Sequence, residues 1–176
     1  CHLKPNTKGS FKFKAALLPR LGGAGVQAYT AGLPGGLQTF MFLFDAGTGE
    51  LAAIMEVLYY DWLKTAAVAA VATKHLAPPD SSVAALFGTG RHARTQLHAL
   101  CAVRPIKRVQ AYSRTRERRE SFCRAMEQEL GIAVVPADTP EEALSGADVI
   151  TTITTSAEPV FDGAVLEDKP LHINAM

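Results

Sequence analysis

Two glycines and an alanine at fixed spacing form the stretch with the clearest chemical potential. Gly88, Gly90 and Ala93 follow the apolar run 83–87 and precede residues that favour a helix. In a strand, tight turn and helix of this kind, the first glycine makes the turn and the second lets a pyrophosphate approach the backbone. The third small residue lets the helix pack on the strand. The motif alone also fits an ordinary glycine turn, but the flanking patterns favour a dinucleotide site.

The residues after the next expected strand indicate which dinucleotide is bound. The expected strand 108–112 is followed by Ser113, Arg114 and Thr115. At this position an acidic side chain would bind the ribose 2′-hydroxyl of NAD, whereas an arginine pairs with the 2′-phosphate of NADP. No acid stands here, and two hydroxyls and a guanidinium can all bind a phosphate. The sequence therefore predicts NADP, with NAD the less favoured cofactor.

Three hydroxyl side chains follow another expected strand. Thr154, Thr155 and Ser156 come at the end of the stretch 148–154, at the edge where ligands bind in open α/β sheets. Turn formation explains the same hydroxyls equally well.

Lysines provide candidates for binding a carboxylate. Lys64 and Thr65 are expected in the first turn of an alanine-rich helix that begins at Trp62, where free N–H groups also point outward. Spacing alone favours the simpler interpretation that Lys64 extends to solvent. Lys12 and Lys14 share one face of an expected strand over 11–15, and a solvated face is again favoured over substrate binding.

The expected elements divide the chain into two parts. Strands over 37–44 and 51–55, joined by a glycine-rich turn, predict an antiparallel hairpin in the first part. Further on, strands and helices alternate as in a doubly wound parallel sheet, which makes the fold class α/β. We place the boundary between residues 1–78 and residues 79–176. The expected strands of the second part are 83–87, 108–112, 132–135, 148–154 and 171–175.

Composition excludes several classes of protein. The 176 residues are 48% hydrophobic and 20% charged with a net charge of +1, which is typical of a globular protein and gives no overall field for nucleic acid. The basic run 104–124 is interleaved with glutamates, which again disfavours nucleic acid. Charged residues within 51–72 disfavour a membrane span. Three cysteines without metal-ligand spacing predict no metal site and a reducing, cytoplasmic location.

Taken in order, six local motifs resemble the ornithine cyclodeaminase and mu-crystallin family, most nearly its mu-crystallin-like members. The resemblance implies homodimers with a split dimerisation domain and a Rossmann domain, which makes residues 1–78 a partial α+β dimerisation and substrate domain. It also implies oxidation of amino acids or reduction of imino acids with NAD or NADP. The motifs are Thr48–Met55, Lys64–Ala67, Gly88–Gly90, Ser113–Thr115, Gly146–Ile150 and His172–Ala175.

The resemblance also implies roles for individual residues. Ser113, Arg114 and Thr115 would hold the adenosine phosphate, and Thr154 and Thr155 would lie near the ribose or nicotinamide. The residues expected to cradle the pyrophosphate are Gly88, Thr89, Gly90, Arg91 and His92.

This chain departs from the family pattern at the expected substrate site. Lys64 stands where the family usually has an arginine, and Gln27 stands where it usually has a lysine. The family's catalytic aspartate corresponds to a position beyond Met176, so we expect the chain to be a fragment with a truncated Rossmann domain.

Two hypotheses follow. In the favoured one the protein is an NADP-dependent oxidoreductase of a small imino or amino acid, such as a ketimine reductase, amino-acid dehydrogenase or cyclodeaminase, with Lys64 as a catalytic residue and Gln27 and Lys64 binding substrate. In the alternative it is a non-enzymatic protein that binds NADPH and a small ligand.

Overall fold

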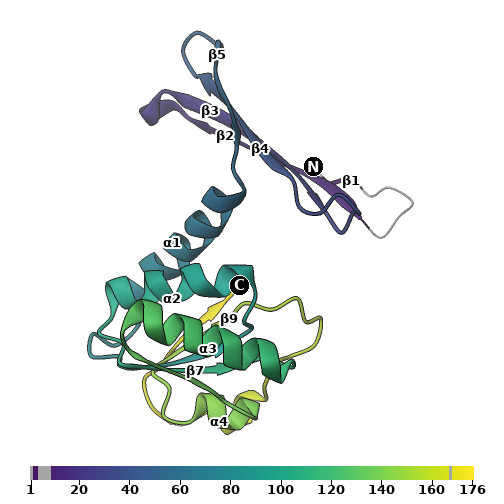
Figure 1. Cartoon of the computed structure of the whole chain (residues 1–176). Coiled ribbons are helices and arrows are strands. Elements are labelled where there is room, and N and C mark those ends of the chain that lie inside the picture. The colour runs from purple at the N-terminus through teal and green to yellow at the C-terminus, as the bar shows by residue number, and fades with distance from the viewer. Residues whose placement is uncertain (1, 4–8, 167) are drawn as a thin grey trace. The chain divides into compact units, whose positions relative to one another are not determined.

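The computed structural model describes residues 2–3, 9–166 and 168–176, so Cys1 lies outside the described part. It divides into two compact units, Cys1–Asp61 and Trp62–Met176 (Figure 1). Most of helix α1 (Leu58–Leu76) therefore packs within the second unit, whereas the sequence placed the boundary after this helix.

The first unit is an antiparallel sheet whose strands follow one another in chain order. Its connection from β4 to β5 is the predicted glycine turn, in which the Asp45 carboxylate accepts the N–H groups of Gly47 and Thr48, both at 2.8 Å. The N–H groups of Thr48 and Gly47 hold the pKa of Asp45 below its usual range. The predicted hairpin is thereby confirmed. The elements are β1 (His2–Leu3), β2 (Ser10–Leu18), the 3₁₀ helix η1 (Pro19–Leu21), β3 (Gly23–Ala31), β4 (Thr39–Asp45) and β5 (Leu51–Glu56).

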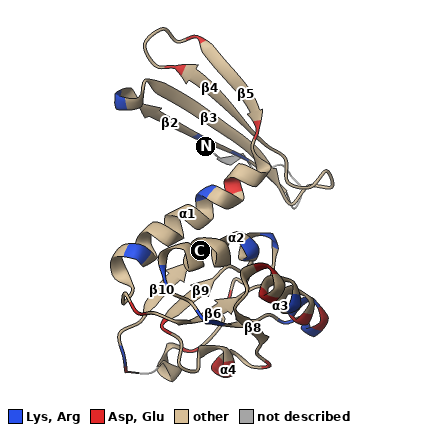
Figure 2. Ribbon diagram, turned by 60° about the vertical axis from the view of Figure 1, so that its left-hand side comes forward, with Lys and Arg blue, Asp and Glu red and all other residues tan. Residues whose placement is uncertain are grey.

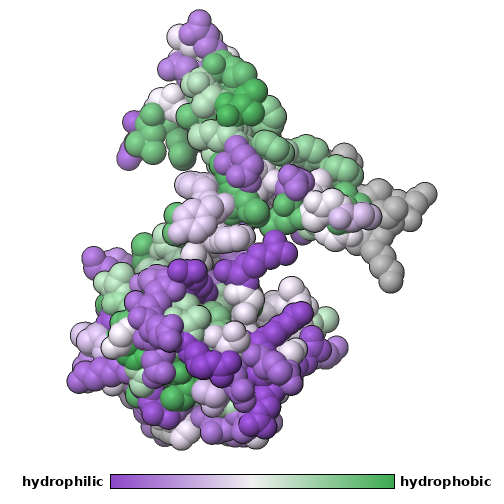
Figure 3. Space-filling model, in the orientation of Figure 1, coloured by the Kyte–Doolittle hydropathy of each residue, from purple (hydrophilic) through white to green (hydrophobic). Residues whose placement is uncertain are grey.

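Strand alternation gives this sheet two different faces. The cross-strand pairs Phe13 with Ala28, Ala28 with Phe40 and Phe42 with Ile54 put large apolar side chains on one face. We call this the apolar face. Figure 3 shows apolar side chains gathered over these strands. Its members that are at least 38% exposed are Phe11, Phe13, Leu17, Phe40, Leu51 and Ile54.

The second unit is a parallel sheet with the strand order β10-β9-β6-β7-β8. This order confirms the predicted Rossmann-type fold. The link from β9 to β10 differs from the predicted alternation, because its described residues form the 3₁₀ helix η2 (Gly163–Val165) rather than an α-helix. The remaining elements are β6 (Val83–Phe87), α2 (Arg91–Val103), β7 (Arg108–Tyr112), α3 (Arg116–Leu130), β8 (Ala133–Pro136), α4 (Pro140–Leu144), β9 (Val149–Thr152) and β10 (His172–Ala175).

Helices cover both faces of this parallel sheet, α2 and α3 on one side and α4 on the other (Figure 1). Along β6, Ala84 and Leu86 belong to the core under α2 and α3, whereas Ala85 and Phe87 belong to the core on the α4 side. All four are at most 1% exposed. A strand buried on both faces must be apolar throughout, which explains the uninterrupted run that the sequence shows before Gly88.

The start of β6 is fixed by a carboxylate. Asp148 accepts the N–H groups of Ser82 at 2.8 Å and Val83 at 3.0 Å, and Lys169 Nζ donates to it at 2.9 Å. Desolvation alone would raise the pKa of Asp148, but these three donors together outweigh it and hold that pKa below its usual value. Strand β6, which leads into the glycine loop, is thus anchored at its first residue.

A buried polar chain ties α1 to the edge strand of the sheet. Asn174 Nδ2 donates to Thr73 Oγ1 at 2.9 Å, and Thr73 Oγ1 donates to the Ala69 carbonyl at 2.8 Å. His172 Nε2 lies 3.0 Å from Asn174 Oδ1. The motif 172–175, noted from the sequence, therefore has a structural role in holding α1.

Candidate functional site

The glycine loop leaves β6 in a conformation that only glycine adopts readily. Gly88 has a φ of +102°, and a Cβ there would lie 2.4 Å from the Ile153 carbonyl oxygen. Its N–H donates to the Tyr112 carbonyl at 2.8 Å. Gly88 thus joins the carboxyl ends of β6, β7 and β9, which is the edge where open α/β sheets bind ligands.

The second glycine borders open space. A Cβ built on Gly90 would meet no atom within 4 Å, although its φ of −84° suits any residue. Gly90 is the N-cap of α2, and no side chain caps this helix. The N–H groups of Arg91 and His92 therefore remain available to an anion, which the helix dipole also favours, whereas the Ala93 N–H donates to the Gly90 carbonyl at 3.1 Å. Ala93 is fully buried and lets α2 pack closely, as the motif predicts.

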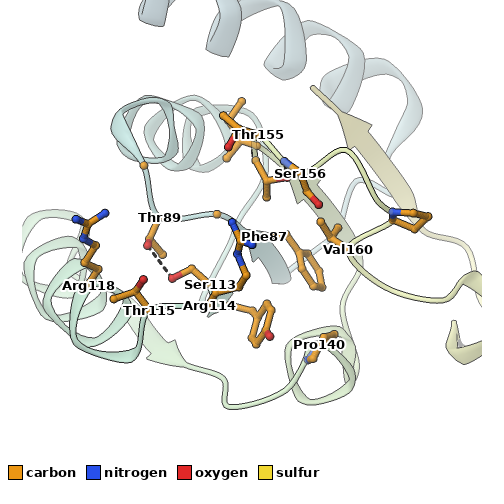
Figure 4. Close-up of a pocket in the computed structure, with 16 residues that line it drawn as sticks. Phe87, Thr89, Ser113, Arg114, Thr115, Arg118, Pro140, Thr155, Ser156 and Val160 are labelled. Carbon is orange, nitrogen blue, oxygen red and sulfur yellow. Dashed lines mark hydrogen bonds between the residues drawn. The ribbon is translucent and has the colours of Figure 1, made fainter. Parts of the chain in front are cut away.

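A pocket of about 420 Å³ lies beside this loop (Figure 4), within the size range of small-ligand sites. The loop after β7 supplies one wall, with Ser113 Oγ hydrogen-bonded to Thr89 Oγ1 at 2.9 Å. Predicted cofactor residues that line the pocket are Gly88, Thr89, Gly90, Ser113, Arg114, Thr115, Thr154 and Thr155.

The pocket is cationic. Arg114 and Arg118 line it, and none of its sixteen lining residues is acidic. The Ser113 hydroxyl and the two guanidinium groups give it donors suited to phosphate oxygens. Arg118 escaped the sequence analysis, although its place in the first turn of α3, at the same sheet edge as Thr115, is a signal that could have found it.

The opposite wall comes from the segment after β9. Thr154 Oγ1 accepts the N–H of Ser156 at 3.2 Å, and Ser156 Oγ donates to the Glu158 carbonyl at 2.9 Å. Thr154 and Ser156 therefore stabilise a turn, as one interpretation predicts, and both also line the pocket. Other lining residues not predicted from the sequence are Phe87, Tyr112, Pro140, Ile153, Pro159 and Val160.

Two predicted cofactor residues lie outside the pocket lining. Arg91 is exposed, and the half-buried His92 ring packs edge-on against Trp62, with 6.3 Å between ring centroids. Both residues nevertheless belong to the first turn of α2, so their backbone lies beside the loop.

In the first unit, Gln27 lies in a polar contact network. It is 7% exposed and donates to Thr39 Oγ1 at 3.1 Å and to Asp61 Oδ1 at 3.3 Å. Its cross-strand partner is Lys14, and the ammonium groups of Lys12 and Lys14 lie 5.8 and 5.2 Å from the centre of the Tyr29 ring. A cation–π contact of this kind holds both lysines along the Gln27 face of the sheet.

The placement of Lys64 in the first helical turn is wrong. Helix α1 begins at Leu58, where Glu56 Oε1 accepts the Leu58 N–H at 2.9 Å, so Lys64 and Thr65 fall in the second turn. The free N–H groups at the helix start are therefore not beside Lys64. Lys64 is half-buried in the second unit, whereas Gln27 belongs to the first.

A family model describes most of this chain. The ornithine cyclodeaminase/mu-crystallin family model matches residues 23–176, which include the glycine loop and every pocket-lining residue. The chain belongs to this family.

Relatives and solved structures of this family include oxidoreductases. The chain is 36% identical over 140 residues to the ketimine reductase mu-crystallin of Rattus norvegicus, covering 79% of this chain and 43% of that protein. It superposes with a TM-score of 0.88 and 31% identity on the Thermococcus litoralis Δ1-pyrroline-2-carboxylate reductase in complex with NADH and L-proline, covering 95% of this chain and 53% of that one. An archaeal alanine dehydrogenase dimer with bound NAD gives a TM-score of 0.88 and 31% identity, covering 98% and 54%.

The chain spans about half the length of these relatives. Among the described residues, no group of three or more His, Cys, Asp or Glu side chains could hold a metal ion. No helix of the described part is long and apolar enough to cross a membrane.

Proposed function

We propose that this protein is an NADP-dependent oxidoreductase of a small imino or amino acid. The observation that carries the proposal is the glycine loop, where Gly90 borders open space at the uncapped start of α2 beside a cationic pocket. These features suit a nucleotide pyrophosphate. The bound nicotinamide would supply the hydride, and the residues of this chain would bind and orient.

The preference for NADP rests on the loop after β7. Ser113, Arg114 and Thr115 line the pocket there together with Arg118, and no carboxylate is among the lining residues to accept a ribose 2′-hydroxyl. The two solved relatives described above hold NADH and NAD, so the preference is proposed for this chain from its own side chains. Titration with NADPH and NADH, followed by cofactor fluorescence, tests it. Equal affinities would contradict the role of Arg114, and Arg114→Ala should weaken NADPH selectively.

For substrate, we assign carboxylate binding to Lys64 and a polar contact to Gln27. Lys64 keeps the positive charge of the usual arginine but presents a single ammonium instead of a two-pronged guanidinium. The names of the relatives, a ketimine reductase and a pyrroline carboxylate reductase, support a small imino acid as the substrate class.

Gln27 also supports the alternative of a non-enzymatic binder of NADPH and a small ligand. Its amide nitrogen already donates to Thr39 and Asp61, and it carries no charge for a substrate. Turnover of a panel of cyclic and acyclic imino acids with NADPH separates the two proposals. Robust activity with any of them would eliminate the binder.

We further propose that the protein forms a homodimer through the apolar face of the first unit. Six large apolar side chains on one sheet face are each at least 38% exposed, more than a monomer usually leaves together. A second copy is the favoured occupant because the archaeal relative is described as a dimer. Light scattering after gel filtration should give a dimer for the wild type and a monomer for Ile54→Lys. Leu76→Lys, at an exposed site on α1, is the control.

A cytoplasmic location is proposed on the cysteines. Cys101 and Cys123 are both free thiols, as expected in a reducing compartment.

A further inference from the structure

Arg119 is a buried cation that lies just behind the pocket wall. Its side chain is only 5% exposed. Nη1 donates to the Ser113 carbonyl at 2.8 Å, Nη2 pairs with the Asp138 carboxylate, and the guanidinium lies 5.8 Å from the centre of the Tyr112 ring. A buried guanidinium is costly to desolvate, so three directed contacts in one place point to a positional role.

The partners of Arg119 belong to the walls of the pocket. Tyr112 and Ser113 line it directly, whereas Arg119 itself does not. Asp138 lies two residues before Pro140, which lines the wall next to the loop after β7. The Arg119 guanidinium therefore links the loop after β7 to the segment before α4, and both segments border the pocket.

The segment on the Asp138 side is itself held firmly. Glu142 Oε2 accepts the Asp138 N–H at 2.7 Å, and Thr139 Oγ1 accepts the Glu142 N–H at 3.1 Å. These two hydrogen bonds at the start of α4 fix the backbone that carries Asp138 and Pro140. Arg119 thus braces the Ser113 loop against a rigid support.

We propose that Arg119 is a positioning residue for NADP selectivity, which rests on the proposed function. By holding the Ser113 carbonyl, it fixes the direction in which Ser113, Arg114 and Thr115 present their donors to the 2′-phosphate. It acts through these residues and does not touch the nucleotide. Removal of the Arg119 side chain weakens the contacts to the 2′-phosphate more than it weakens the contacts that NADPH and NADH have in common.

The test measures the dissociation constants of NADPH and NADH for four proteins. These are the wild type, Arg119→Met, Asp138→Asn and the control Arg124→Met, whose side chain on the same helix is 70% exposed. Because the Ser113 carbonyl loses a charged donor, we expect Arg119→Met to lower the NADPH preference about tenfold. Asp138→Asn keeps a neutral acceptor in place and should lower it about threefold. Arg124→Met should leave the preference unchanged.

The deciding measurement is the ratio of the NADPH and NADH dissociation constants, because a general loss of stability would weaken the binding of both nucleotides equally. An unchanged ratio in folded Arg119→Met overturns the inference. If that variant does not fold, Asp138→Asn decides in the same way, because the Asp138 side chain is 67% exposed and its replacement should be tolerated. A wild type that binds neither nucleotide overturns the proposed function, and the inference with it. A wild type that prefers NADPH beside variants with an unchanged ratio overturns the inference alone.

Discussion

The substitution Gly90→Ala should weaken nucleotide binding while leaving the stability of the fold nearly unchanged. In Gly90→Ala the new Cβ would meet no protein atom within 4 Å, and the φ of −84° is ordinary for alanine. Reduced freedom of the unfolded chain stabilises such a variant by about 0.4–1 kcal/mol. Alanine is a poorer N-cap than glycine, which offsets this gain. The free energy of unfolding should therefore stay within about 1 kcal/mol of the wild type.

Nucleotide affinity should respond very differently. The methyl group occupies the space through which a pyrophosphate would reach the N–H groups at the start of α2. Displacing the phosphate from one such donor forfeits a hydrogen bond to a charged group, worth about 1.5–3 kcal/mol. The dissociation constant of NADPH should therefore rise about tenfold to a hundredfold.

Titration by NADPH fluorescence and unfolding in urea measure the two quantities. Gly35→Ala is a matched control, because a Cβ there also meets nothing within 4 Å and the residue lies in a loop of the first unit. Wild-type NADPH affinity in folded Gly90→Ala would refute the placement of a pyrophosphate at this loop. A loss of affinity in the control of similar size would refute it as well.

Three further predictions concern stability and reactivity. Gly88→Ala should lower the free energy of unfolding in urea by about 1–3 kcal/mol, because of its positive φ and the carbonyl 2.4 Å from the new Cβ; unchanged stability would contradict the loop geometry. Asp148, whose folded-state pKa is lowered, stabilises the fold above its unfolded pKa of about 3.9, so the advantage of wild type over Asp148→Asn should vanish as pH falls below about 4. A constant difference across that pH range would oppose this assignment. Burial raises the pKa of Cys123 to about 11, so at pH 8 iodoacetamide should modify it only after denaturation, which mass spectrometry of the peptides would show.

Local sequence signals predicted most of the second unit, apart from the link between β9 and β10, because its elements are marked by short-range chemistry. The apolar run before Gly88 predicts a strand. Thr139 followed by Pro140 is likewise typical of a helix start, and Thr139 Oγ1 accepts the Glu142 N–H there. The helix α1 begins at Leu58, before the expected start at Trp62, because its first turn carries no such local signal. Tyr59 and Tyr60 lack the alanine-rich signal, and a carboxylate from Glu56 sets the first turn.

The pocket-lining residues could be predicted from the sequence only where one continuous segment forms a complete side of the pocket. The glycine loop and the triplet 113–115 are of this kind, and they line the pocket together. Arg118 and Pro140 were missed because their convergence depends on the strand order and on where each helix begins. Arg119 is harder still to predict, because nothing in the sequence distinguishes a buried arginine from the other charged residues of the same run. Figure 2 shows arginines and glutamates side by side along α3.

In the proposed homodimer, the apolar face of the first unit would constrain how this protein can vary. In a two-fold pairing of identical chains each position occurs twice, so a single codon change is felt at two places. Trimming one methylene at Ile54 would cost about 0.8 kcal/mol per copy and about twice that per pair. If the apolar face pairs in this way, its residues should change more slowly among related sequences than those of the solvated helices, and compensating substitutions should occur among the residues that face each other.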